Sequence, residues 1–504
     1  MSALSVLRPR LGSAPWVLGL LALWLLATAG LRPLLLPDEG RYGEVAREML
    51  AGDGLVPLLG GLPFFHKPPL TYWVDMLAMR VFGVSAFAAR MGPALGAWLM
   101  GAALWLTLRR WHGERVAAAG LGALATCVFF YVGGQYANHD MLVAGTLSVA
   151  VLAFARALEQ PGTVDARWRL AGWAACGLAV LAKGLIGIVL PALIIGPWLL
   201  ARGRWRQLLA LLHPAGLAVF AVIALPWFVA MQQRFPGFFD YFVMEQHFRR
   251  YASAGTFNNR QPVWFYFAVL PLLTLPWSAF APAALRRFWQ QRAWADSDGR
   301  GALLAWWLLA ILLFFSLPKS KLVGYILPTL APWCMLIAPV LVASRWRRTA
   351  TALGVVLCLG SVVLLAWQAP KSNRDVGRAL ARQMGAGDQV VMVDGGFHDV
   401  AFEARLAKPA LLASRWDDPA IRLRDDWRRE LSDATRFDPA AAEALLVPLD
   451  SLPRLVCQGQ VIWLVEGNHA NPRAAQVPGA VKVMQGRHAQ LWRAPPRQCE
   501  PVAA

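Results

Sequence analysis

Long apolar runs, separated by short polar segments, recur along most of the chain. A run of about 18 or more apolar residues lets a helix cross the hydrocarbon core of a bilayer. We therefore predict a mainly α-helical, polytopic membrane protein with about eleven spans. Their expected limits are 15–36, 86–107, 116–133, 141–157, 168–182, 184–200, 212–231, 263–283, 301–317, 322–343 and 350–368.

The polar segments between these spans differ in how basic they are, according to the side of the membrane on which the topology places them. Under this topology one side receives the basic segments "RRWHGER" (109–115), "RGRWR" (202–206), "RRFWQQR" (286–292) and "RWRR" (345–348). Basic loops mark the cytoplasmic side of a membrane protein. The opposite side, which we expect to be the periplasm of a Gram-negative cell, then receives 37–85, 134–140, 232–262, 318–321 and 370–504.

The last part of the chain has a different pattern. "GDQVVMVDGG" and "QVIWLVEG" are typical of buried β-strands, and "DVGRALARQM" is typical of a helix. We predict a membrane domain over 1–368, with an external loop at 37–85, and a small periplasmic α/β domain over 369–504. No GxGxxG follows a strand, so no nucleotide is expected as a cofactor.

Composition agrees with a membrane protein: 57% of the residues are hydrophobic, 16% are charged, and the mean hydropathy is +0.44. The net charge of +19 is explained by cytoplasmic loops, and no nucleic-acid-binding pattern accompanies it. Four of the six cysteines lie in apolar spans, where we expect packing roles. The other two, Cys457 and Cys499, would be able to form a disulfide outside the cytoplasm.

A dense mixed-charge segment, "LLLPDEGRYGEVAREML" (34–50), follows the first span directly. Asp38 and Glu39 stand at an expected helix start, where a carboxylate can cap free N–H groups. Two adjacent acids exceed what a cap requires, so one of them is a candidate general base. Asp140, in "YANHDML", is a second external acid, for which helix capping is the alternative role.

External cations lie beside apolar segments, which suggests a lipid phosphate as ligand. Lys183 lies within "LAVLAKGLIGIVLP", and Lys321 and Tyr325 lie in "SLPKSKLVGYILP". The alternatives are snorkelling of Lys183 to the interface and a polar interhelical turn around Lys321 and Tyr325.

"LPFFHKPPLTYW" (62–73) places His66 beside Lys67. His66 and His247 are candidate ligands of a divalent metal such as zinc or magnesium. The alternative for His66 is an ordinary hydrogen-bonded histidine.

Five motifs together carry a family resemblance: "PDEGRYGEVAREML", "PFFHKPPLTYW", "NHDML", "LAKGLIGIVLP" and "KLVGYILP". In this order they resemble the bacterial branch of the protein O-mannosyltransferase superfamily, and most closely the aminoarabinose transferases that modify lipid A. The resemblance implies a GT-C fold with about 11–13 transmembrane helices. It also implies a sugar donor linked to undecaprenyl phosphate, a lipid-borne acceptor, and a periplasmic active site built around the first external loop.

The resemblance also implies roles for individual residues. Asp38 would be the catalytic carboxylate in direct displacement at the anomeric carbon, and the other expected active-site residues are Glu39, Arg41 and Asp140. The expected donor-phosphate ligands are Lys67, Lys183, Arg249, Arg250, Lys321 and Tyr325. Aminoarabinose members of the family tend to have Glu in a metal site where this chain has His66, which weakens the assignment of that particular sugar.

Three alternatives stay open on sequence grounds. A sibling enzyme would transfer galactosamine, mannose, glucose or a related sugar, or would modify protein, O-antigen or another glycan. A transporter or lipid flippase would also be polytopic, but the charges gather at one membrane face and no inverted repeat is visible. An adaptor protein would leave the external charged motifs unexplained.

Overall fold

The computed structural model describes residues 13–249, 259–296, 298–423 and 426–498. The side chains of residues 13, 246–249 and 422 are outside this description. Contacts between residues divide the chain into two units. The first, called the helical unit, comprises 1–29, 92–226 and 259–364; the second, called the mixed unit, comprises 30–91, 227–258 and 365–504.

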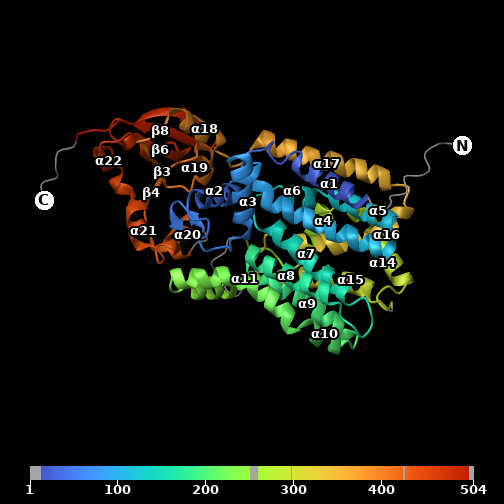
Figure 1. Ribbon diagram of the computed structural model, residues 1–504. Helices are drawn as coiled ribbons and strands as arrows, with labels where there is room; N and C mark the ends of the chain where they lie inside the picture. The colour runs from blue at the N-terminus through green and yellow to red at the C-terminus, as the bar shows by residue number, and fades with distance from the viewer. Residues whose placement is uncertain (1–12, 250–258, 297, 424–425, 499–504) are drawn as a thin grey trace. The chain divides into compact units, whose positions relative to one another are not determined.

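The helical unit is built of apolar helices (Figure 1). Its main helices are α1 (Ser13–Leu26), α4 (Met91–His112), α5 (Glu114–Ala125), α6 (Val128–Gly133), α7 (Asp140–Ala157), α8 (Ala166–Lys183), α9 (Ile186–Ala201), α10 (Trp205–Leu211), α11 (Pro214–Arg234), α13 (Phe265–Leu273), α14 (Ala281–Gln290), α15 (Arg300–Ser316), α16 (Leu330–Ala343) and α17 (Arg347–Gln368). The last residues of α11 and α17, from 227 and from 365 on, belong to the mixed unit. A 3₁₀ segment, η4 (Val323–Thr329), leads into α16. Their buried apolar side chains form one continuous core.

Within the described residues, five helices are long and apolar enough to cross a membrane, or six if the pair 265–273 and 277–290, bent by 103°, counts as one span. Three shorter apolar helices accompany them. The prediction of a polytopic, mainly α-helical membrane protein is therefore confirmed.

Several predicted spans are shorter or more broken than expected. The first predicted span, 15–36, is helical only as far as Leu26, because Gly30 and Pro33 follow and disfavour helix. The span predicted at 116–133 is interrupted between α5 and α6. Hydropathy measures apolar character and is insensitive to such breaks.

Glycines allow the helices that carry predicted site residues to pack closely. A Cβ built on Gly145 of α7 would lie 2.0 Å from the carbonyl oxygen of Gly96 in α4. A Cβ on Gly172 of α8 would lie 2.5 Å from the ring of Phe154 in α7. Small residues let helix backbones approach each other in a membrane. These close contacts fix α7 against both α4 and α8.

The mixed unit contains a six-stranded sheet of order β5-β4-β3-β6-β8-β7. Its strands are β3 (Gln389–Val393), β4 (Leu411–Ser414), β5 (Leu446–Pro448), β6 (Ile462–Gly467), β7 (Val481–Gln485) and β8 (Ala489–Ala494). The pairs β3–β4, β3–β6 and β4–β5 are parallel, and β6–β8 and β7–β8 are antiparallel. The central strands are buried along nearly their whole length, and apolar clusters cover both faces of the sheet. The predicted α/β domain is confirmed.

Helices α18 (Arg374–Gln383), α19 (His398–Ala404), α20 (Trp427–Ala434), α21 (Pro439–Leu445) and α22 (Leu452–Leu455) accompany this sheet (Figure 1). The same unit also contains α2 (Asp38–Ala51), a small hairpin of β1 (Leu58–Leu59) and β2 (Leu62–Pro63), and α3 (Leu70–Phe82). A Cβ on Gly40 would lie 2.9 Å from the Cβ of Asp399, so this glycine lets α2 pack directly on α19. The segment 37–85 thus groups with the C-terminal residues, and the domain boundary at residue 368 stays a prediction.

The cysteines of the apolar spans behave as predicted: Cys127, Cys176, Cys334 and Cys358 are buried free thiols. Cys457 takes part in a disulfide. Cys499, the partner expected for it, lies outside the described residues.

Candidate active site

The charged segment after the first span forms α2, and Asp38 is its first residue. The carboxylate of Asp38 accepts a hydrogen bond from Nη2 of Arg41, one turn further on, at 2.6 Å. The residue in the N-cap position is Pro37, which has no side-chain donor or acceptor for the helix end. Asp38 is therefore held by an ion pair, and about a third of its side chain is exposed.

Arg41 connects Asp38 to the C-terminal part of the chain. Its Nη1 donates to a carboxylate oxygen of Glu430 in α20. Its Nη2 also lies 3.3 Å from the hydroxyl of Tyr42, and its guanidinium lies 4.7 Å from the centre of the Tyr42 ring. Burial alone would lower the pKa of Arg41, but Glu430, Tyr42 and Asp38 together outweigh burial and raise it well above its usual range. Arg41 is a permanent cation between two acids.

Glu39, the neighbour of Asp38, has a different environment. It is completely buried between Arg32 and Arg90, and Nε of Arg90 donates to it at 2.9 Å. The backbone N–H of Leu35 also donates to it, at 3.2 Å. Burial would raise the pKa of Glu39, but the two arginines lower it to about 2. These contacts fasten the start of α2 and leave Glu39 little freedom to act as a base.

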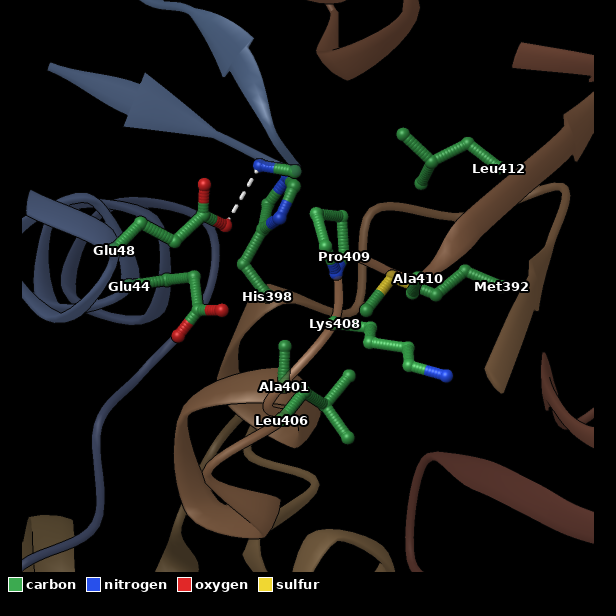
Figure 2. Close-up of a pocket in the computed structure, with 11 residues that line it drawn as sticks. Glu44, Glu48, Met392, His398, Ala401, Leu406, Lys408, Pro409, Ala410 and Leu412 are labelled. Atoms are coloured by element: carbon green, nitrogen blue, oxygen red, sulfur yellow. Dashed lines mark hydrogen bonds between the residues drawn. The ribbon is translucent and has the colours of Figure 1, made fainter. Parts of the chain in front are cut away.

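Further along α2, Glu44 and Glu48 lie one turn apart (Figure 2); Glu44 is buried and Glu48 is partly buried. Arg47 donates two hydrogen bonds of 2.7 Å to Glu44. Glu48 accepts from the backbone N–H groups of Gly60 and Gly61, at 2.8 and 2.9 Å. Burial raises the pKa of Glu44 to about 8 despite Arg47, and Glu48 adds to this effect. The acid pair therefore retains a proton at neutral pH.

The acid pair lines a small cavity together with His398 of α19 and Lys408, all within the mixed unit (Figure 2). Figure 2 shows the ammonium end of Lys408 pointing away from the two carboxylates. Burial, with the charge of Arg41, lowers the pKa of His398 to about 3, so this imidazole is neutral. The free volume is about 10 Å³, room for about one water molecule. This cavity is too small for a sugar.

His66 and Lys67 follow the small hairpin of the mixed unit. The ring of His66 is buried and stacks on Phe64, with ring centres 4.7 Å apart. Lys67 donates to the backbone carbonyl of His66 at 3.0 Å. Among the described residues, no group of three His, Cys, Asp or Glu side chains is placed to hold a metal ion. The side chain of His247, the second predicted ligand, is outside the described part, so the metal prediction is untested.

A second cluster, called the Lys183 cluster, lies in the helical unit and comprises Asn138, Asp140, Lys183 and Tyr325. Lys183 is the last residue of α8 and forms an ion pair with Asp140, the first residue of α7. Asn138 donates to the other oxygen of Asp140 at 3.2 Å. Nζ of Lys183 lies 4.7 Å from the centre of the Tyr325 ring. Asp140, Lys183 and Tyr325, which come from three separate sequence motifs, thus lie next to one another.

Gly324 makes room for this cluster. A Cβ at that position would lie 2.2 Å from a carboxylate oxygen of Asp140, which is closer than any real contact. The glycine therefore belongs to the geometry that holds Asp140. Sequence reasoning had missed it, although it precedes Tyr325 in the motif "KLVGYILP".

Lys321 has backbone partners. Its Nζ donates to the carbonyl of Gln261 at 3.0 Å and to that of Pro318, and the residue is buried. The backbone N–H of Lys321 donates to Asn259 at 2.9 Å, and Gln261 donates to Lys319 at 3.1 Å. These bonds join residues 259–261 to residues 319–321.

Asp38, Glu39 and Arg41 lie in the mixed unit, and Asp140, Lys183, Lys321 and Tyr325 lie in the helical unit. The side chain of Arg249, and Arg250 as a whole, lie outside the described residues. Glu430 is the residue that sequence reasoning missed in the mixed unit. It stands 389 positions from Arg41, and nothing in the local pattern "DDWRRELSD" distinguishes it from a surface acid.

Comparison with known proteins identifies relatives of this chain. Residues 66–229 match the family model described as dolichyl-phosphate-mannose-protein mannosyltransferase. The undecaprenyl phosphate-alpha-4-amino-4-deoxy-L-arabinose arabinosyl transferase 2 of Sodalis glossinidius is 36% identical over 335 residues, which are 66% of this chain and 59% of the relative. The corresponding protein of Pseudomonas fluorescens is 35% identical over 363 residues, 70% of this chain and 64% of the relative. The chain spans about three fifths of the length of these relatives.

Two solved structures resemble the model. The crystal structure of ArnT from Cupriavidus metallidurans bound to undecaprenyl phosphate has a TM-score of 0.81 and 24% identity, and covers 97% of this chain and 100% of that one. The archaeal oligosaccharyltransferase AglB from Archaeoglobus fulgidus has a TM-score of 0.54 and 14% identity, and covers 90% and 69%. These likenesses show a common fold. Together with the sequence relatives, they confirm the resemblance predicted from the motifs.

Proposed function

We propose that this protein is a glycosyltransferase that moves a sugar from undecaprenyl phosphate to lipid A or another lipid-borne acceptor. The observation that carries the proposal is the similarity, at 35–36% identity, to transferases named for an undecaprenyl phosphate-linked aminoarabinose. The likeness in fold to a protein bound to undecaprenyl phosphate supports the donor. Aminoarabinose or a related sugar is the proposed cargo.

Asp38 is the proposed general base. It takes the proton from the acceptor oxygen as that oxygen forms a bond to the anomeric carbon. The bond from the anomeric carbon to the phosphate oxygen breaks in the same displacement, and undecaprenyl phosphate leaves with the electron pair. The partial exposure of Asp38 at the start of α2 supports this choice, because the carboxylate is fixed by Arg41 and still open to an acceptor.

Lys67, Lys183 and Tyr325 are the proposed partners of the donor phosphate, with Arg249 or Arg250 contributing from outside the described residues. Cations stabilise the negative charge that gathers on a leaving phosphate. The Lys183 cluster supports this role, because Asp140 and Tyr325 hold an ammonium group at the end of α8. The contacts of Glu39 and Lys321 favour structural roles for both residues.

His66 and His247 are the proposed ligands of a divalent metal. No step of the displacement depends on it. Measuring the metal content of the purified protein, and activity after chelation, checks this part separately.

The site is proposed to face the periplasm from the bacterial inner membrane. The basic segments that the sequence places on the other side support this orientation. A periplasm-active reporter fused to the C-terminus checks it: activity of the reporter is expected, and an inactive reporter on a well-expressed fusion would contradict it.

The reaction is tested with the purified protein in liposomes that contain lipid A and undecaprenyl phosphate-linked aminoarabinose. Mass spectrometry should show lipid A that has gained one aminopentose, and none with Asp38→Asn. If the donor is consumed and lipid A does not change, the acceptor is a molecule other than lipid A. No consumption of this donor, or of other undecaprenyl phosphate sugars, would contradict the proposal.

A further inference from the structure

We propose that Glu430, in α20, is a positioning residue that sets the direction of Arg41 and thereby the direction and strength of Asp38 as a base. The inference rests on the proposed function and adds a residue of the C-terminal part to the site. One guanidinium joins the two acids: Nη1 of Arg41 donates to Glu430, and Nη2 donates to Asp38 at 2.6 Å.

The geometry of arginine gives this bridge its directional effect. A guanidinium is planar, and its N–H groups point in fixed directions. When one edge is held by Glu430, the direction of the opposite N–H is set as well. Asp38 is therefore aligned by a group that α20 fixes in place.

Burial distinguishes a fixed end from an open end. The side chain of Glu430 is 9% exposed and that of Arg41 is 14% exposed, whereas that of Asp38 is 32% exposed. A partly exposed ion pair is mobile and weak, but a buried charged hydrogen bond is strong. The contact between Arg41 and Glu430 thus anchors the bridge, and Asp38 is the end that can meet an acceptor.

Charge gives Glu430 a second effect. An arginine paired with Asp38 alone would favour the ionised carboxylate and make it a weaker base. Glu430 places a second negative charge on the same guanidinium and offsets this pull. Asp38 is then oriented by a cation that it shares with a second acid.

Two other titratable groups that act on Arg41, Tyr72 and His398, cannot supply this charge. Tyr42 belongs to α2, Tyr72 to α3 and His398 to α19, and each interacts with Arg41. Burial raises the pKa of Tyr72 and lowers that of His398 to about 3, so both are neutral near pH 7. Among these described neighbours, Asp38 and Glu430 are the two carboxylates that pair with Arg41.

The test compares Glu430→Gln and Glu430→Asp with the wild type in the liposome assay, over a range of pH. Glu430→Gln is expected to lower kcat about 10-fold or more, to change the KM for the donor little, and to move the acid limb of the pH profile to lower pH. Glu430→Asp keeps the charge and should recover part of kcat and most of the pH profile.

Asp433→Asn is the matched control. Asp433 lies on the same helix, accepts from Tyr241 at 3.4 Å and pairs with Arg436 at 3.6 Å. This variant disturbs an ion pair of α20 without touching Arg41, so it should retain wild-type kcat and pH profile. An equal loss in both variants would mean that α20 matters only for folding, and would overturn the inference.

A double variant closes the test. If Glu430 acts through Arg41, adding Glu430→Gln to Arg41→Gln should cause no further loss, because effects that share one path are not additive. A further 10-fold loss, or an unchanged kcat and pH profile in the folded single variant, would overturn the inference. If Glu430→Gln does not fold, Glu430→Asp is compared with the wild type instead: its shorter side chain should lower kcat in part, and an unchanged kcat would overturn the inference. A folded wild type that transfers no sugar would instead contradict the proposed function.

Discussion

Lys183 forms an ion pair with Asp140, and the two residues are the last of α8 and the first of α7. The ammonium group also faces the ring of Tyr325, 4.7 Å from its centre. Snorkelling to the interface, the alternative role considered for Lys183, requires no such partners. The pairing fixes a cation at a helix end, where the proposed reaction needs one for the leaving phosphate.

Lys183→Met should reduce transfer at least about 100-fold, because it removes a cation that stabilises charge in the transition state. It also leaves Asp140 without its cation, which by itself destabilises the protein. The double variant Lys183→Met with Asp140→Asn removes both charges and should recover thermal stability without recovering transfer. Full transfer by a folded Lys183→Met variant would show that the lysine is an interface anchor.

Gly324→Ala should reduce transfer while the protein still folds, since the added methyl group would displace a carboxylate oxygen of Asp140. Gly360→Ala is the control, because a Cβ at Gly360 in α17 meets nothing within 4 Å. Rates and thermal midpoints are measured for both. Equal transfer rates in the two variants would mean that displacing Asp140 does not affect the reaction.

Glu39→Gln should destabilise the mixed unit by about 3–5 kcal/mol, because Arg32 and Arg90 would lose their buried anion. Thermal unfolding in detergent measures the change. Glu39→Gln protein with wild-type stability and no transfer would contradict this structural role and support direct chemistry by Glu39.

The proton on the acid pair of α2 should make stability depend on pH. Because burial raises the pKa of Glu44 to about 8, the folded protein holds a proton that the unfolded chain releases near pH 4.5. The stabilisation is complete below that pH and is lost as the pH rises through about 8. The free energy of unfolding should then fall by up to roughly 1.4 kcal/mol per pH unit in this window.

Glu44→Gln provides the comparison, since the amide mimics the protonated acid. Its thermal midpoint should fall less than that of the wild type between pH 7 and pH 8, a range in which His398 is mostly neutral in both states. The same slope in both proteins would show that Glu44 is ionised when folded.

Apolar runs predicted the membrane helices, because length and hydropathy are local properties. Breaks were harder to predict: the bend of 103° between 265–273 and 277–290 depends on how the chain packs around it. The strands β4 and β5 were missed because each has at most four residues, too few to show a pattern.

The residues of the candidate site likewise include some that the sequence predicted and some whose role depends on the fold. Motif resemblance selected Asp140, Lys183 and Tyr325, which the structure brings together across 43 and more positions of sequence. It also selected Glu39 and Lys321, whose buried partners became visible only in the fold. Glu430 and Gly324 carry no local signal of their own, since their importance lies in Arg41 and Asp140 beside them.

The most direct test of the central claim is lipid A mass spectrometry on a strain that lacks this gene, complemented with the wild type or with Asp38→Asn. We predict that a sugar-sized addition disappears in the deletion strain, returns with the wild type, and does not return with an equally expressed Asp38→Asn variant. The mass of the addition then identifies the class of sugar. Lipid A that is identical in all these strains would contradict lipid A as the acceptor, and an addition restored equally by both proteins would contradict Asp38 as the base.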